Sequence, residues 1–269
     1  MDNYDLLDLL RRMVECNASD LYLTTGAPPQ VKVDGVVQAL PFATLVPGQV
    51  HKLAYSAMGP AAIDEYERTM ECNMSYSPQG IGRFRVNIYQ QRREAGMVIR
   101  LVRSDIPEFE SLGLPSGMRE LAMRQRGLIL IIGSAGSGKT TTLASMVDYR
   151  AQHQSGHILT VEDPIEYLFR HGLSTVDQRE VGIDTLSFSN ALRNAMRQAP
   201  DMIVIGEIRD RETMEHAVAF AETGHLCLAT LHANSANQAL DRIVNFFPEE
   251  RRAQLLMDLS LNLKAMVSQ

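Results

Sequence analysis

The feature that most constrains the fold is a glycine-rich loop that separates an apolar run from a helix-forming run. Its residues fit the pattern G-x-x-x-x-G-K-[ST] and are Gly133, Ser134, Ala135, Gly136, Ser137, Gly138, Lys139 and Thr140. Residues 127–132 predict a buried strand before the loop, and Thr141 opens the run that predicts a helix after it. A chance glycine-rich turn is disfavoured, because the pattern is complete and correctly flanked.

This arrangement predicts a site for a nucleoside triphosphate. The N–H groups of the loop and the N-terminus of the helix carry positive partial charge, which attracts a polyphosphate. We expect Lys139 to reach the β- and γ-phosphates and the Thr140 hydroxyl to bind Mg²⁺, with Thr141 as a further nucleotide-binding residue.

The composition of the chain limits which classes of protein it can belong to. The chain has 269 residues, 45% hydrophobic and 22% charged, which indicates an ordinary globular protein of one or two domains. No apolar stretch approaches the roughly 20 residues of a bilayer span, and the acidic residues 1–5 lack a basic leader, so we expect a cytoplasmic protein. The formal net charge of -6 argues against a nucleic-acid partner. Cys16, Cys72 and Cys227 fit neither a disulfide framework nor a metal site and are expected to be buried free thiols.

The first part of the chain predicts a small α/β domain over residues 1–110. Asp34-Gly35 between short apolar runs indicates a two-residue hairpin. Helices are expected at 4–16, 48–58 and 61–69, and further strands at 19–24, 71–77, 83–90 and 96–103. The segment from Ser104 to Pro115 contains two prolines and predicts a linker.

The second part, residues 111–269, predicts a mostly parallel sheet with helices on both faces. Buried strands are expected at 127–132, 157–161, 202–206 and 226–231, alternating with helices at 139–152, 187–198, 210–223 and 235–245. Ligands of such sheets bind at the carboxyl ends of the strands. Residues 249–269 are expected to form an amphipathic helix, and because no helix stop follows, we expect further C-terminal residues to be missing.

Polar side chains follow three of these strands. Glu162 comes after the second strand, Glu207 after the third and His232 after the fourth. Glu207 has the position of an acid that holds Mg²⁺, and His232 that of a group sensing the γ-phosphate. An acid after a strand is more often a helix cap, but together with the loop these residues favour nucleotide hydrolysis. Glu162 and Glu207 are the candidates for orienting or deprotonating water.

Arginines crowd the end of the first part. Six occur between residues 83 and 103, and on a strand Arg83 and Arg85 share one face. They either form a solvated polar face or contact phosphate, for which arginine is well suited, in the site of a neighbouring subunit. His225 follows Thr223-Gly224, so a helix-capping role is its alternative. His225, Cys227 and His232 lack two further ligands for a zinc site.

Four sequence boxes, taken in order, make the chain resemble the PilT/PilU group of type IV pilus motor ATPases, within the secretion ATPase superfamily. Residues 133–140 are similar to the Walker A box, 158–167 to the Asp box, 197–210 to the Walker B box and 221–234 to the His box. Residues 220–240, 71–73 and 178–182 look closer to PilU than to PilT. The likeness covers essentially the whole chain.

This resemblance implies a PAS-like N-terminal domain, a RecA-like ATPase domain and a hexameric ring that binds ATP and Mg²⁺ between subunits. It implies a cytoplasmic motor for pilus retraction and twitching motility, peripheral at the inner-membrane pilus platform protein and working with a PilT-like partner. Glu207 would be the Walker B acid and Glu162 the catalytic glutamate, while His225 and His232 would be the His-box residues. Arg83, with Arg85 and Arg100 nearby, would make contacts in trans.

The absence of a C-x-x-C pair favours the retraction branch over assembly ATPases that carry a four-cysteine zinc element. Three other readings remain open. One is a ring component whose partner binding matters more than its own hydrolysis. Another is a RecA-like nucleic-acid motor, which the net negative charge of the chain disfavours. A small-molecule phosphotransferase is the third, for which no acceptor pocket or lid is evident.

Overall fold

The computed structural model describes residues 5–269, which form two compact units, 5–103 and Ser104–Gln269. The division comes just after Arg103, at the start of the proline-containing segment, whereas the sequence pattern placed the boundary near residue 110. Residues 1–4 lie outside the described part, and with them the start of the first predicted helix and most of the acidic N-terminus. Within residues 5–269, no helix has the length and hydropathy needed to cross a membrane.

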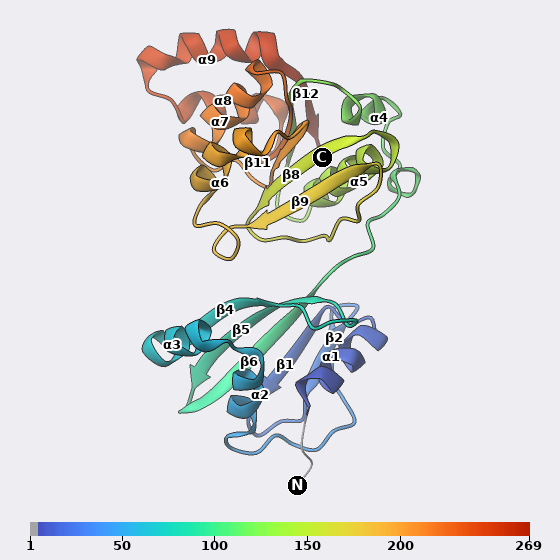
Figure 1. Ribbon diagram of the computed structural model, residues 1–269, viewed down its shortest axis with the longest axis vertical. Helices are drawn as coiled ribbons and strands as arrows, with labels where there is room; N and C mark the ends of the chain where they lie inside the picture. Colours follow the sequence, from blue (N-terminus) through green and yellow to red (C-terminus); the bar gives the residue numbers. More distant parts are fainter. Residues whose placement is uncertain (1–4) are drawn as a thin grey trace. The chain divides into compact units, whose positions relative to one another are not determined.

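The first unit is an antiparallel six-stranded sheet with three helices (Figure 1). Its strand order is β3-β2-β1-β6-β5-β4. The strands are β1 (Asp20–Thr24), β2 (Gln30–Val33), β3 (Val36–Ala39), β4 (Glu71–Tyr76), β5 (Arg83–Gln91) and β6 (Glu94–Val102). The helices are α1 (Leu6–Glu15), α2 (Gln49–Ala57) and α3 (Pro60–Thr69).

Local sequence accounts for these elements. Asp34 and Gly35 have φ angles of 49° and 82°, so the hairpin turn between β2 and β3 forms as the residue pair predicts. On β5 every second side chain enters the core, and Phe84, Val86 and Ile88 are all buried. The opposite face of that strand therefore carries its polar side chains.

The second unit is a six-stranded sheet in which every neighbouring pair is parallel (Figure 1), as the strand–helix alternation predicts. Its order is β12-β7-β11-β10-β8-β9. The strands are β7 (Gly127–Gly133), β8 (Gly156–Glu162), β9 (Ser174–Glu180), β10 (Met202–Ile205), β11 (Leu226–His232) and β12 (Leu263–Ser268). The helices are α4 (Gly117–Ala122), α5 (Lys139–His153), α6 (Phe188–Ala195), α7 (Arg211–Glu222), α8 (Ala236–Asn245) and α9 (Glu249–Asn262), with 3₁₀ turns η1 (Phe109–Leu112) and η2 (Met196–Gln198).

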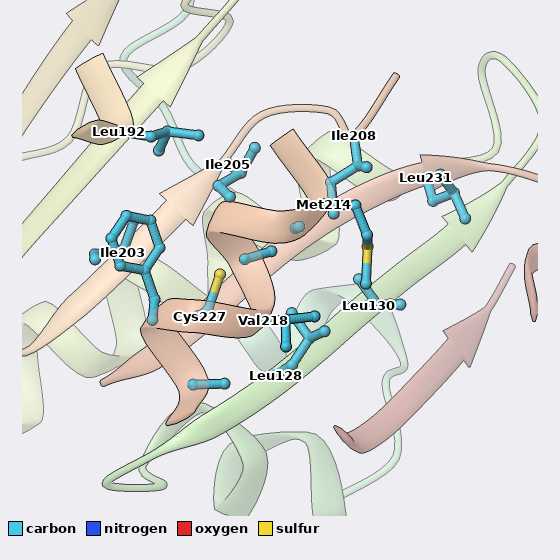
Figure 2. Close-up of a cluster of buried hydrophobic side chains, with 14 of the residues drawn as sticks. Leu128, Leu130, Leu192, Ile203, Ile205, Ile208, Met214, Val218, Cys227 and Leu231 are labelled. Atoms are coloured by element: carbon cyan, nitrogen blue, oxygen red, sulfur yellow. The ribbon is translucent and has the colours of Figure 1, made fainter. Parts of the chain in front are cut away.

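Side chains that alternate along β7 bury both faces of this sheet. Leu128 and Leu130 belong to a buried cluster to which α6, α7, α8 and α9 contribute, and Figure 2 shows both beside Met214 and Val218 of α7. Ile129 and Ile131 point to the other face, where α4 and α5 cover them. Because each such side chain contributes about 1.5–3 kcal/mol on burial, the apolar run over residues 127–132 fixes β7 between two helical layers.

Two expectations about this chain are wrong, and one strand was not predicted. The helix expected over 249–269 stops at Asn262, and residues 263–268 form β12, since pairing with β7 extends the sheet. The strand β9 was missed because its residues are mostly polar and do not form the apolar run typical of a buried strand. It lies at the edge of the sheet. Cys72 and Cys227 are buried, but Cys16 is exposed at the end of α1.

Beyond β12, the last residue reaches back to the glycine-rich loop. The Gln269 amide N–H donates to Ile132 O at 2.9 Å, and Gln269 Nε2 donates to Thr142 Oγ1 at 2.7 Å. Residues from the end of the sequence thus support the strand and the helix on either side of that loop.

Candidate functional site

The predicted polar residues gather at the carboxyl edge of the parallel sheet. The register pairs His232 of β11 with Gly133 of β7, and β11 lies between β7 and β10 in the sheet. Glu207 follows the end of β10, while Glu162 ends β8 on the far side of β10. One sheet edge therefore presents the glycine-rich loop, an imidazole and two carboxylates in a row.

The loop leaves β7 at Gly133 and enters α5 at Lys139. Gly136 and Gly138 have φ angles of 76° and 98°, which L side chains rarely adopt. Lys139 Nζ donates to Ser134 O at 2.7 Å, so the ammonium folds back over the loop. Burial lowers the pKa of Lys139, and Glu207 and Glu166 partly oppose this shift.

These residues fit a phosphate group. Ser134, Ala135 and Gly136 are exposed at the mouth of the loop. Ser137 Oγ is buried and has no hydrogen-bond partner within the described residues. A side chain at Gly133 would collide with Ser137, so glycine keeps this turn narrow. Thr140 and Thr141, in the first turn of α5, are half-buried.

Glu207 is held from two sides. Arg209 Nε donates to Glu207 Oε2 at 2.8 Å, and His232 Nε2 lies 3.4 Å from Glu207 Oε1. The same guanidinium donates from Nη1 to Asp163 Oδ2 at 3.0 Å. Gly206 lets β10 approach β8 here, because a Cβ on it would lie 3.2 Å from the Cα of Glu162.

Glu162 differs from Glu207 in its surroundings. Only 6% of it is exposed, and its Oε1 accepts hydrogen bonds from Thr160 Oγ1 at 2.6 Å and Gln178 Nε2 at 3.0 Å. Burial raises its pKa, and the nearby charge of Glu166 adds to this, while the hydrogen bonds act in the opposite direction. A carboxylate with a raised pKa is better able to take a proton from water.

Sequence reasoning missed three residues that touch this site. Gln178 was noted only for its likeness to PilU, and Tyr167 only as part of the Asp box, while the role of Arg209 beside Glu207 was not foreseen. Gln178 lies on β9, which the sequence pattern did not predict, so no local signal placed it beside Glu162.

The N-terminal arginines lie in the first unit. Arg85 on β5 and Arg100 on β6 are directly paired in the register, and Arg83 is two residues from Arg85 on the same face. Arg83 donates to Ser75 Oγ at 3.3 Å. Arg100 Nε donates to the buried Asp20 at 2.8 Å, which is a structural contact.

His225 does not join the carboxyl-edge group within one chain. It precedes β11, at the opposite end of that strand from His232. Its amide N–H donates to Phe220 O at 3.0 Å, and Gly224 before it has a φ of 96°, so His225 completes the C-terminal cap of α7.

Known proteins share this arrangement. The family described as "Type II/IV secretion system protein" matches residues 71–269. The type IV pilus ATPase PilU of Pseudomonas aeruginosa is 53% identical over 97% of this chain and 68% of its own length. PilT of the same organism, a type IV pilus retraction ATPase, is 43% identical over 98% of this chain and 77% of its own. A crystal structure of the pilus retraction motor PilT with bound ADP has a TM-score of 0.94 at 46% identity, over 99% of this chain and 78% of that one.

Proposed function

The chain belongs to the family of type II/IV secretion system proteins, and we propose that it is an ATP-hydrolysing motor that drives type IV pilus retraction and twitching motility. One observation carries this proposal. Lys139, Glu207 and Glu162 come together at one edge of a RecA-like parallel sheet, as hydrolysis requires. The similarity to PilU and PilT supports the type IV pilus as the structure on which the motor acts.

We assign the roles of the site residues from their positions. The phosphates of ATP would be bound by residues 133–138 together with Lys139, Thr140 and Thr141. Mg²⁺ would be held by Thr140 and Glu207. Mg²⁺ supplies charge neutralisation for the transferred phosphoryl group. Glu162, buried and with a raised pKa, would orient the attacking water and accept its proton. His232, 3.4 Å from Glu207, would respond to the γ-phosphate.

We infer that the motor is a homohexameric ring whose sites lie between subunits. In that ring the PAS-like unit of one subunit would deliver Arg83 to its neighbour's ATP, with Arg85 and Arg100 nearby. His225, at the other end of β11 from His232, would reach nucleotide only from an adjacent subunit. The ring would be cytoplasmic and would dock on the inner-membrane platform protein of the pilus.

We further propose that this ATPase is an accessory to a PilT-like motor. The observation that favours this is the greater identity to PilU, 53%, than to PilT, 43%. A ring component whose partner binding matters more than its own hydrolysis is the second candidate. Intact Lys139, Glu162 and Glu207 favour retained hydrolysis over that candidate.

ATP turnover measured against protein concentration tests the proposal, alone and with a PilT-like partner, with Lys139→Ala as control. Turnover per subunit that rises steeply with concentration and is lost in the variant would support an oligomeric ATPase with shared sites. Turnover only in the presence of the partner would support the accessory role. No turnover in either case would leave a nucleotide-binding structural role.

A further inference from the structure

A chain of hydrogen bonds links the phosphate-loop helix to Glu162. Tyr167 Oη lies 3.1 Å from Thr141 Oγ1, in the first turn of α5. The carbonyl oxygen of the same tyrosine accepts from Gln178 Nε2 at 2.9 Å. Gln178 Nε2 also donates to Glu162 Oε1 at 3.0 Å, which closes the path from the loop to the buried carboxylate.

The amide of Gln178 is held in one orientation. Its Nε2 faces two acceptors, Glu162 and Tyr167 O, while its Oε1 accepts the Phe169 N–H at 2.9 Å. Turning the amide over would place oxygen against two acceptors and nitrogen against a donor. Gln178 therefore presents a fixed N–H donor to Glu162.

Tyr167 is anchored in the same way. It is 7% exposed, and its hydroxyl contacts α5 one residue after Thr140. One buried residue thus contacts the phosphate-loop helix through its hydroxyl and Gln178 through its backbone carbonyl. No other group in this path is charged until Glu162 is reached.

We propose that Tyr167 and Gln178 are positioning residues. They orient the Glu162 carboxylate and couple its orientation to the position of the phosphate loop. This inference rests on the proposed function, because the carboxylate has a reaction to serve only if the chain hydrolyses ATP. Gln178 contacts Glu162 directly and Tyr167 contacts Gln178, so each would act through Glu162. Their removal therefore lowers kcat and leaves nucleotide binding intact.

Steady-state ATPase kinetics of the full chain, with its partner where the wild type requires one, test this. Gln178→Leu removes the donor at similar volume and is expected to lower kcat about ten- to hundredfold, the usual cost of losing an orienting contact. KM and the Kd of a fluorescent ADP analogue should change less than about twofold, since binding is not touched. Tyr167→Phe, which loses only the hydroxyl, should show the same pattern more weakly. Gln254→Leu, at an exposed position of α9, is the matched control and should match the wild type.

A double-mutant cycle separates positioning from a general packing effect. In a Glu162→Gln background, Gln178→Leu should cause no further loss of kcat, because the carboxylate it aims is gone. An equal fold-loss in both backgrounds, or loss of kcat and binding together, would overturn the inference. Wild-type turnover with an unchanged kcat in Gln178→Leu would overturn it while leaving the proposed function standing. No turnover by the wild type would overturn both.

If Gln178→Leu fails to fold, as judged by circular dichroism and thermal melting, Tyr167→Phe decides the question. Its kcat should fall while its melting temperature stays near that of the wild type, because only one half-exposed hydrogen bond at Thr141 is lost. An unchanged kcat in that variant would overturn the proposed coupling between the phosphate loop and the orientation of Glu162.

Discussion

Arg209 holds the Glu207 carboxylate through a hydrogen bond of 2.8 Å from its Nε to Glu207 Oε2. Since Nη1 of the same guanidinium reaches Asp163 at 3.0 Å, one planar group connects the acids that follow β8 and β10. Glu207 is thereby fixed beside the phosphate loop, with its other oxygen turned to His232.

Replacing Arg209 should loosen Glu207. We expect Arg209→Ala to lower ATP turnover by about ten- to hundredfold, as losses of residues that orient metal ligands usually do. Arg209→Lys should restore little, because an ammonium cannot reproduce two bonds in fixed directions. The assay is steady-state phosphate release. Arg211→Ala, which breaks an ion pair with Glu215 on α7, is the control, and equal effects of the two alanine variants would contradict the prediction.

Glu207→Gln should trap ATP. The amide keeps the shape but loses the charge that we propose holds Mg²⁺, so turnover should fall by on the order of a hundredfold or more while nucleotide stays bound. Filter binding of radiolabelled ATP, with the adenine nucleotides then separated, measures both effects at once. Unchanged turnover would remove Glu207 from the mechanism.

Arg83→Ala should separate turnover from binding. A group that stabilises charge only in the transition state lowers kcat far more than affinity, and arginines of this kind contribute about a thousandfold or more. ATP binding should weaken only modestly. Arg12→Ala, an exposed arginine paired with Glu15 on α1, serves as control. Equal losses of binding and turnover by Arg83→Ala would rule out the trans role.

Glu162→Gln should stabilise the folded chain in a pH-dependent manner. Burial raises the pKa of Glu162 in the folded state, whereas an unfolded glutamate titrates near about 4.3. Between the unfolded and the folded pKa, Glu162 is ionised in the unfolded state but still protonated in the folded state. The free energy of unfolding of the wild type therefore falls as the pH rises, until the folded pKa is passed. The variant has no such penalty.

The melting temperature of Glu162→Gln minus that of the wild type should therefore be smallest near pH 4 and grow as the pH rises. Thermal melts across pH 4 to 8 measure it, and Thr160 and Gln178 can still donate to the new amide oxygen. A difference that stays constant with pH would show that Glu162 has an ordinary pKa.

Much of the ATPase fold was predictable from local sequence. The unbroken apolar run of β7, buried on both faces, indicated an interior parallel strand, and the alternation of strands and helices indicated the layers around it. Elements whose pairing depends on distant residues were missed. Polar β9 is a strand because β8 pairs with it, and β12 is a strand because β7 offers it a free edge.

The sequence by itself determined the chemistry available: a phosphate loop whose glycines permit its turns, and carboxylates placed directly after buried strands. Only the tertiary structure decided how those groups are aimed. It placed Gln178 and Thr160 on Glu162, Arg209 and His232 on Glu207, and His225 at the opposite edge from the loop. Gln178 and His232 reach these carboxylates because strand order and register bring together residues far apart in the chain. Thr160 and Arg209 each lie two residues from the carboxylate they contact, and the backbone geometry of the folded chain directs their side chains onto it.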